Sequence, residues 1–88
     1  MKIDIQTPYF IKSLKLKEET GDKMGMAASL GNIGNIYTDQ GNYEQALAHY
    51  GKCLKICEEL GDKRGMASSY INIGSILQNQ GNHEQALA

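Results

Sequence analysis

The sequence repeats itself with a period of 40 residues, and this repeat constrains the fold more than any other feature. GDKMGMAASLGNIGNIYTDQGNYEQALA, which runs from Gly21 to Ala48, aligns with GDKRGMASSYINIGSILQNQGNHEQALA, which runs from Gly61 to Ala88. When the alignment starts nine residues earlier, 24 of 37 positions are identical. A repeat of this length is typical of solenoid proteins, in which each unit buries its apolar face against its neighbours.

The first half of each unit has the pattern of an amphipathic helix. Leu30, Ile33 and Tyr37 are spaced three and four residues apart, which predicts one apolar helix face. Gly34 makes a notch in this face. Because glycine inside a helix costs about 1 kcal/mol relative to alanine, we expect a neighbouring helix to approach closely at Gly34.

A turn and a second helix follow. Glycine suits the left-handed position just after a helix, so Gly41 is expected to end the first helix, and Asn42 can cap the next one. Gln45, three residues after Asn42, gives the spacing of a capping box. One face of the second helix is expected to carry Ala46, Tyr50, Cys53 and Leu54.

These signals predict five helical segments, at about 8–20, 23–40, 43–60, 63–80 and 83–88. Thr7 is expected to cap the first segment, with Pro8 in its first turn. Gly21-Asp22 and Gly61-Asp62 are the other expected junctions, where aspartate caps the following helix.

The same signals divide the chain into four parts. Residues 1–7 form a tail, 8–20 the second helix of a partial unit, 21–60 a complete unit, and 61–88 a second, truncated unit. Since a helix cut at Ala88 would leave the apolar side of its partner uncovered, we expect the chain to be a piece of a longer array.

Composition excludes several classes of function. The chain has 88 residues and a net charge of -1, which gives no electrostatic reason to expect nucleic acid or an anionic membrane as a partner. No apolar run approaches the ~20 residues needed to span a bilayer, and the N-terminus lacks the apolar core of a signal peptide. Two cysteines without a disulfide framework fit a reducing compartment, so we expect a cytoplasmic protein.

The repeat resembles that of tetratricopeptide-repeat proteins. The family pattern has a large residue, then Leu-Gly, then Tyr in the first helix, and Ala followed by an aromatic in the second. In this sequence these places hold Leu30, Ile33, Gly34, Tyr37, Ala46 and Tyr50. The next unit has Tyr70, Ile73, Gly74, Leu77 and Ala86 in these places, and Phe10 holds the aromatic place of the unit before. The period is longer than the usual ~34 residues, and Glu58 stands where proline usually closes the second helix. Both departures resemble the long-repeat class found in kinesin light chains and spindle-orientation adaptors.

The resemblance implies an all-α fold of antiparallel helix pairs stacked as a right-handed superhelix. It also implies a protein-interaction scaffold that binds a peptide or partner protein on the concave face lined by the first helices. The residues agree, because Asn32, Asn35 and Asp39 form one stripe of the first helix at spacings of three and four, and a carboxamide both donates and accepts hydrogen bonds. We therefore hypothesise that Asn32, Asn35 and Asn72 hold the main chain of a partner, with Ser68, Ser75 and Asn79 helping. The alternative is that these residues are only solvated polar side chains.

Other kinds of site are disfavoured by the residues. GNIGN lies inside a helix and lacks the lysine of a phosphate-binding loop. His49, Cys53 and Cys57 share a helix face but extend over ~12 Å of it, so all three cannot bind one zinc ion. No nucleophile or acid has a convincing catalytic partner, so we expect neither an enzyme nor a bound cofactor or metal.

A second class of function is structural self-assembly, in which open repeat ends form homo-oligomers or exchange helices. For either function the expected packing core is Leu14, Leu30, Ile33, Ile36, Tyr37, Ala46, Leu47, Tyr50, Leu54, Ile73, Ile76 and Leu77.

Overall fold

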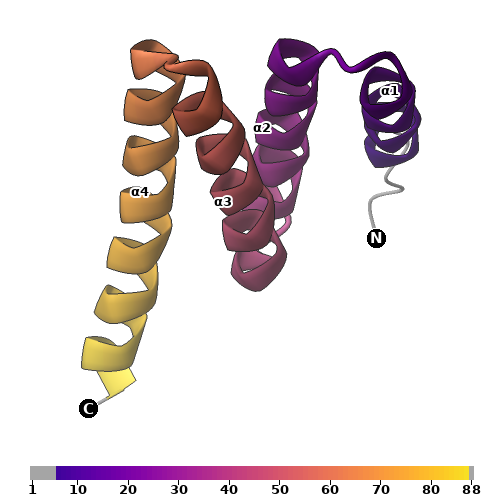
Figure 1. Cartoon of the computed structure of the whole chain (residues 1–88). Coiled ribbons are helices and arrows are strands. Elements are labelled where there is room, and N and C mark those ends of the chain that lie inside the picture. The colour runs from indigo at the N-terminus through magenta and orange to yellow at the C-terminus, as the bar shows by residue number, and fades with distance from the viewer. Residues whose placement is uncertain (1–5, 88) are drawn as a thin grey trace.

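The computed structural model describes the backbone of residues 6–87 and the side chains of residues 6–81. It contains four helices: α1 (Thr7–Thr20), α2 (Lys23–Asp39), α3 (Tyr43–Leu60) and α4 (Lys63–Leu87). Each runs antiparallel to the one before it, and together they form a zigzag row with α1 at one end and α4 at the other (Figure 1). The described part of the chain is therefore all-α, as the repeat predicts.

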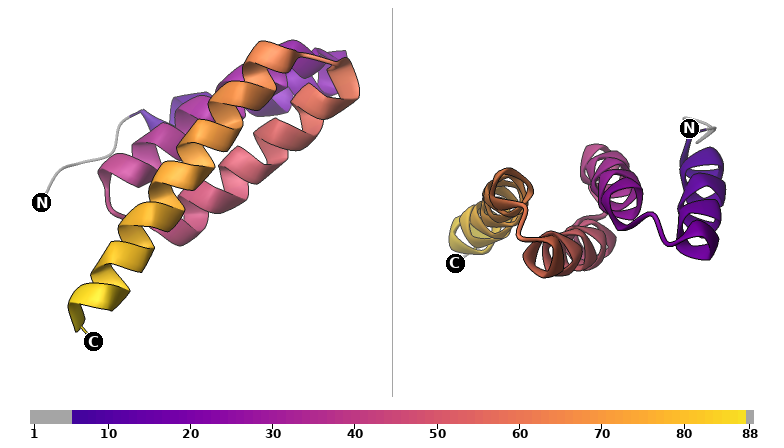
Figure 2. Two further views of the ribbon diagram at one scale, coloured as in Figure 1. Left: turned by 90° about the vertical axis from the view of Figure 1, so that its left-hand side faces the viewer. Right: turned by 45° about the horizontal axis from the view of Figure 1, so that its top comes forward.

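Each helix packs against its neighbours in sequence. The α2–α3 interface is the most extensive, followed by α3–α4 and α1–α2. Seen with its top brought forward, the row alternates from side to side (Figure 2). This arrangement gives α2 and α3 neighbours on both sides, whereas α1 and α4 each have one.

Three of the four predicted helix junctions form, at Gly21, Gly41 and Gly61. Gly21, Gly41 and Gly61 have φ angles of 73°, 75° and 69°, the left-handed conformation that favours glycine. Asp22 accepts a hydrogen bond from the Gly25 amide at 2.9 Å, and Asp62 accepts one from the Gly65 amide at 3.1 Å. Asn42 accepts from the Gln45 amide at 3.4 Å. The predicted caps at these three junctions are thus present.

The start of α1 differs by one residue from the prediction. Thr7 is the first helical residue and Gln6 is the N-cap, so the prediction that Thr7 caps this helix is wrong. Proline has no amide hydrogen to lose, and Pro8 fits in the first turn with Thr7 already helical. Residues 1–5 of the predicted tail lie outside the described residues.

The prediction of a fifth helix is also wrong. Helix α4 continues through Gly81 and Asn82 to Leu87, where the repeat predicts a turn and a new helix. A returning helix of about six residues would be too short to be stable by itself, whereas continuing an existing helix adds one backbone hydrogen bond per residue. The turn signal at Gly81 permits a break but does not impose one.

The core forms around α3. Ala46, Tyr50 and Ile76 make a buried cluster, against which Tyr37, Tyr43, Leu47 and Ile73 pack. Among the other residues predicted to form the core, Leu30 and Ile33 are buried, while Leu14, Ile36 and Leu54 are half-buried.

Leu77 is the exception, since its side chain is 53% exposed and its prediction as a core residue is wrong. It lies on a face of α4 over which no helix of the described part of the chain packs. Cys57, Ser29 and Ser69 are buried without having been predicted as core.

Candidate functional site

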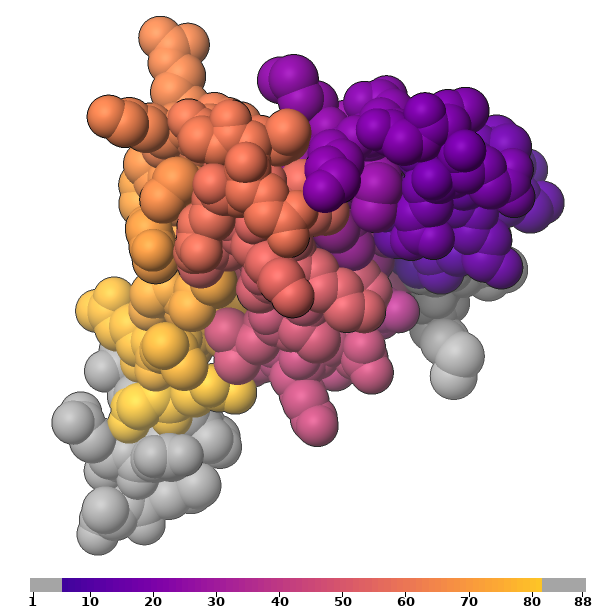
Figure 3. Space-filling model, in the orientation of Figure 1, coloured from indigo at the N-terminus to yellow at the C-terminus, as the bar shows by residue number. Residues whose placement is uncertain are grey.

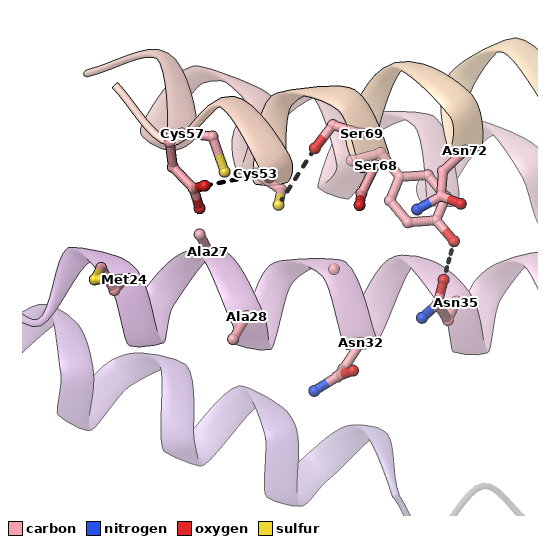
Figure 4. A pocket seen from close by; sticks show the side chains of 14 residues that line it. Met24, Ala27, Ala28, Asn32, Asn35, Cys53, Cys57, Ser68, Ser69 and Asn72 are labelled. Carbon is pink, nitrogen blue, oxygen red and sulfur yellow. Dashed lines mark hydrogen bonds between the residues drawn. The ribbon is translucent and has the colours of Figure 1, made fainter. Parts of the chain in front are cut away.

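A hollow of about 350 Å³ lies between α2 and α4, with α3 beneath it. Its lining comes from all three helices and from the turn that precedes α4. The residues are Met24, Ala27, Ala28, Gly31, Asn32 and Asn35 of α2, Tyr50, Cys53 and Cys57 of α3, and Asp62, Gly65, Ser68, Ser69 and Asn72 at the turn and on α4. Figure 4 shows this hollow with the α2 and α4 residues on opposite sides of it.

Four of the six residues predicted from the sequence line this hollow. Asn32 and Asn35 stand on the α2 side, and Ser68 and Asn72 on the α4 side. The two equivalent asparagines, Asn32 and Asn72, therefore belong to one surface, although they come from different repeats. Since α2 and α4 are both first helices of their units, a shift of one repeat brings equivalent positions to the same side of the row.

The other two predicted residues, Ser75 and Asn79, do not line the hollow. Both are exposed, and they continue the stripe of Ser68 and Asn72 along α4 at spacings of three and four.

The Asn35 amide is held by a hydrogen bond from inside the repeat. The Tyr50 hydroxyl donates to Asn35 Oδ1 (Figure 4), and it also lies 3.4 Å from Thr38 Oγ1. Thr38 in turn donates to the Gly34 carbonyl at 2.9 Å. Because its oxygen already accepts a hydrogen bond, Asn35 presents its NH₂ group as a donor.

Tyr50 reaches this position because of the glycine notch in α2. A Cβ at Gly34 would lie 2.7 Å from the nearest atom of the Tyr50 ring, which is too close for van der Waals contact. The predicted close approach at Gly34 is thus confirmed. The residue that approaches is Tyr50 of α3, which belongs to the same unit.

The floor of the hollow carries two thiols, those of Cys53, which is expected on the apolar face of the second helix, and of Cys57. Cys53 is half-buried and accepts a hydrogen bond from the Ser69 hydroxyl, at 3.6 Å (Figure 4), while Cys57 is 2% exposed. Burial, together with the neighbouring Cys53 and the charge of Asp62, raises the pKa of the Cys57 thiol to about 11. Both cysteines are free, and Cys57 stays a neutral thiol at physiological pH.

The signal for this floor was present in the sequence. Tyr50, Cys53 and Cys57 are spaced three and four residues apart, so they share one face of α3. The sequence alone does not reveal that this face also meets α4, because that contact depends on how the second unit stacks on the first.

The lining is nearly uncharged. Asp62 is the one charged residue among those that line the hollow. Its carboxylate accepts a hydrogen bond from the Gly65 amide at the start of α4. Amides, hydroxyls and small apolar side chains supply the remaining surface. Such a surface holds a ligand by hydrogen bonds and by shape, because it offers little charge.

Neither a metal centre nor a membrane span is found in the described residues. No group of three histidine, cysteine or acidic side chains there is placed to hold a metal ion. Of the helices that are described, none has the length and apolar character needed to cross a bilayer. The GNIGN segment lies within α2, as predicted.

The helices thus pack in antiparallel pairs, an aromatic ring fills the glycine notch, and the first helices share one face. A family model described as tetratricopeptide repeat matches residues 8–59 and, in a second register, residues 25–88. The chain belongs to the tetratricopeptide repeat family. No match was found among curated proteins. Tetratricopeptide repeats generally mediate protein–protein interaction and are typically non-enzymatic scaffolds.

The tetratricopeptide repeat pattern explains why these residues recur. In the complete unit, the Tyr50 ring packs against Gly34, and Ala46 and Leu30 are buried. The small residues permit close contact between helices, and the large ones fill the space that remains.

Proposed function

We propose that this tetratricopeptide repeat chain binds an extended peptide segment of a partner protein in the hollow between α2 and α4. The observation that carries the proposal is the fixed Asn35 amide. With its oxygen held by Tyr50, it directs a donor toward the space where a ligand carbonyl would lie. A donor that is oriented before binding loses less entropy when the ligand arrives.

The other polar residues suit the same ligand. Asn32 and Asn72 each offer a donor and an acceptor, which match the amide and carbonyl of a peptide main chain. Ser68 adds a hydroxyl beside them. Ser75 and Asn79 extend this stripe beyond the hollow and would contact only a longer peptide.

Side-chain preferences follow from the remaining lining. Ala28 and Gly31 leave room for ligand side chains, and Met24 and Cys53 offer apolar, polarisable surface. Because the lining is nearly uncharged, the affinity for a peptide is expected to depend only weakly on salt concentration.

Three finer assignments belong to this proposal. The 40-residue period supports membership of the long-repeat class that resembles kinesin light chain and spindle-orientation adaptor repeats. The two free thiols support a reducing, cytoplasmic location. The amide-lined hollow has no catalytic pair, which supports a binding role without enzymatic activity, and neither nucleic acid nor membrane is proposed as a partner.

The test begins with a displayed library of random linear peptides, selected on the 88-residue chain and followed by affinity measurements on selected peptides by fluorescence anisotropy. Asn32→Ala plus Asn72→Ala removes two ligand hydrogen bonds, each worth about 0.5–1.5 kcal/mol, so we expect affinity to fall about tenfold or more. Gln45→Ala plus Gln78→Ala is the matched control, because both carboxamides are exposed and lie outside the hollow. Failure to select any peptide, or equal affinity in the two double variants, would refute the proposal.

A further inference from the structure

One face of α4 carries apolar residues without a neighbouring helix in the described part of the chain. Tyr70 and Leu77 lie on it with 55% and 53% of their side chains exposed. Gly74 lies between them, and a Cβ built there would meet nothing within 4 Å. This open α4 face, defined by Tyr70, Gly74 and Leu77, therefore holds a glycine notch with nothing in it.

The complete unit shows what covers the same face one repeat earlier. Leu30, Gly34 and Tyr37 are the residues 40 positions before, and Tyr37 packs against the buried cluster that contains Ala46 and Tyr50 of α3. The Tyr50 ring fills the notch at Gly34, and His49 packs on Tyr37 with ring centroids 5.2 Å apart.

An ion pair closes this α2–α3 interface at its other end. Lys23 Nζ lies 3.0 Å from Glu59 Oε2. In the complete unit, the second helix therefore covers the first with three features: an aromatic ring in the notch, a smaller aromatic residue beside that ring, and an acidic residue near its end.

Helix α1 is such a second helix, and it lacks a first helix of its own in the described structure. It aligns with α3 at a shift of 40, so that Phe10 corresponds to Tyr50, Tyr9 to His49 and Glu19 to Glu59. Tyr9 and Leu16 are 72% and 62% exposed. The exposed side of α1 therefore carries the residue types that cover a first helix in the complete unit.

We propose that α1 of one copy of the chain packs against the open α4 face of a second copy, head to tail. In this contact Phe10 enters the notch at Gly74, Tyr9 packs on Leu77, and Glu19 pairs with Lys63, the residue equivalent to Lys23. The interface repeats the α2–α3 interface between two molecules, and it continues the existing row of helices. None of these contact residues lines the hollow between α2 and α4.

Differences between the units fit this pairing. Phe10 has no hydroxyl, and the positions equivalent to Asn35 and Thr38, which surround the Tyr50 hydroxyl, are Ser75 and Gln78 on α4. A phenylalanine in the notch needs no hydrogen-bond partner there. The charges are complementary as well, because Lys63 and Glu19 are both exposed.

The two faces lie at opposite ends of the molecule. The space-filling view shows α1 and α4 at opposite edges of the molecule (Figure 3). One chain cannot close this contact on itself, so the association uses two different surfaces and extends from copy to copy.

The test uses two variants of the 88-residue chain, each blocked at one face. Gly74→Leu fills the notch on α4, where nothing lies within 4 Å, and Tyr9→Glu places a charge on the exposed side of α1. Sedimentation velocity under reducing conditions should show the average mass of the wild-type chain rising with concentration. Each variant alone should self-associate at least tenfold more weakly.

The decisive result is the mixture of the two variants. The Tyr9→Glu chain keeps an intact α4 face and the Gly74→Leu chain keeps an intact α1, so the equimolar mixture should form one-to-one dimers that grow no further. Leu60→Glu is the control, since it places the same charge on an exposed apolar residue outside both faces, and it should associate as the wild type does. Circular dichroism checks that all variants keep their helix content.

A wild-type chain that stays monomeric at every concentration would overturn the proposal. So would a mixture that forms no dimers while the wild type associates. Dimerisation of the Tyr9→Glu chain alone, as strongly as the wild type, would instead assign the contact to two α4 faces and exclude α1.

Discussion

Gly34 and Gly74 show how one residue type at one repeat position can have two different consequences. Both occupy the notch position of a first helix. At Gly34 the Tyr50 ring occupies the space that a Cβ would need, whereas at Gly74 that space is open. The notch is required by the neighbouring helix and not by the helix that contains it.

This difference predicts opposite effects for the same substitution. Gly34→Ala should lower the free energy of unfolding by about 1–3 kcal/mol, because the buried Tyr50 ring is held by its hydrogen bond and cannot move away without disturbing the core. Gly74→Ala should raise it by up to about 1 kcal/mol, because alanine favours the helix and meets no obstacle.

Urea unfolding followed by circular dichroism measures both values, at a concentration where the chain is monomeric. Equal effects of the two substitutions would contradict the assignment of Tyr50 to the first notch.

Cys57 and Lys17 occupy equivalent positions in the two units, but they contact the following helix in different ways. Lys17 Nζ donates to the Gly25 carbonyl and to Ser29 Oγ, both at 3.3 Å. In the second unit the Cys57 sulfur takes this place, and a Cβ at Gly65 would lie 2.5 Å from it. The thiol is enclosed, which is why its pKa is raised.

The raised pKa of Cys57 predicts a loss of stability at alkaline pH. Below pH 9.0, the ordinary pKa of the thiol, both the folded and the unfolded chain keep the proton, so the full stability is present. Between 9.0 and about 11 the unfolded chain releases the proton while the folded chain keeps it, so the free energy of unfolding falls. The loss should be at most about 3 kcal/mol, since one pKa unit corresponds to about 1.4 kcal/mol.

The measurement compares the wild type with Cys57→Ala in urea unfolding from pH 8 to about pH 11. The two chains differ only at residue 57, so the difference between the two slopes reports Cys57. Parallel pH profiles would show that the thiol is not enclosed.

The polar residues of the hollow were partly predictable because they follow the helical period. Asn32, Asn35, Ser68 and Asn72 were found from spacing and from the family resemblance, and all four line one surface. The orientation of the Asn35 amide was not predictable, because it depends on a hydroxyl 15 residues away on another helix. Helical spacing in the sequence predicts where a side chain lies on its helix. It does not predict which residue of another helix that side chain contacts.

At the scale of the helix, boundaries were predictable where several local signals coincide. At Gly41-Asn42 the left-handed glycine and the cap both form, and α2 and α3 end and begin within one residue of the predicted positions. Only half of the capping box forms, since the Asn42 amide donates to the Tyr37 carbonyl and not to Gln45.

The same letters give another result at Gly81-Asn82, where α4 continues as a helix. The two sites share the residues QGN, so the difference cannot come from local sequence. At the first site, a full second helix follows and buries Ala46 and Tyr50 against α2. A turn of this kind is stable only when the helix after it is long enough to bury its apolar face.

At the scale of the whole molecule, stability depends on how many faces are covered by neighbours. In a repeat array each unit contacts only the adjacent ones, so the total is close to a sum of unit and interface terms. The α2–α3–α4 part has two such interfaces around the cluster of Ala46, Tyr50 and Ile76. The open α4 face is a third such surface, over which no helix of the described residues packs.

Supplying the missing side within one molecule should therefore change both the fold of α4 and the stability of the chain. We consider a chain extended after Ala88 by a copy of residues 49–60, HYGKCLKICEEL, which completes the second unit in register. A full second helix can then bury its tyrosine in the notch at Gly74, so the turn at Gly81 should form and the thermal midpoint should rise by several degrees. The urea m-value should rise as well, because more surface is buried on folding.

Gly74→Leu in the extended chain is the matched control, because it fills the notch and should cancel most of the gain. Amide hydrogen exchange would report the new turn as a break in protection near Gly81, flanked by two protected helices. An extended chain with an unchanged midpoint and m-value would mean that the open α4 face does not recognise a second helix, which would also remove the basis for head-to-tail association.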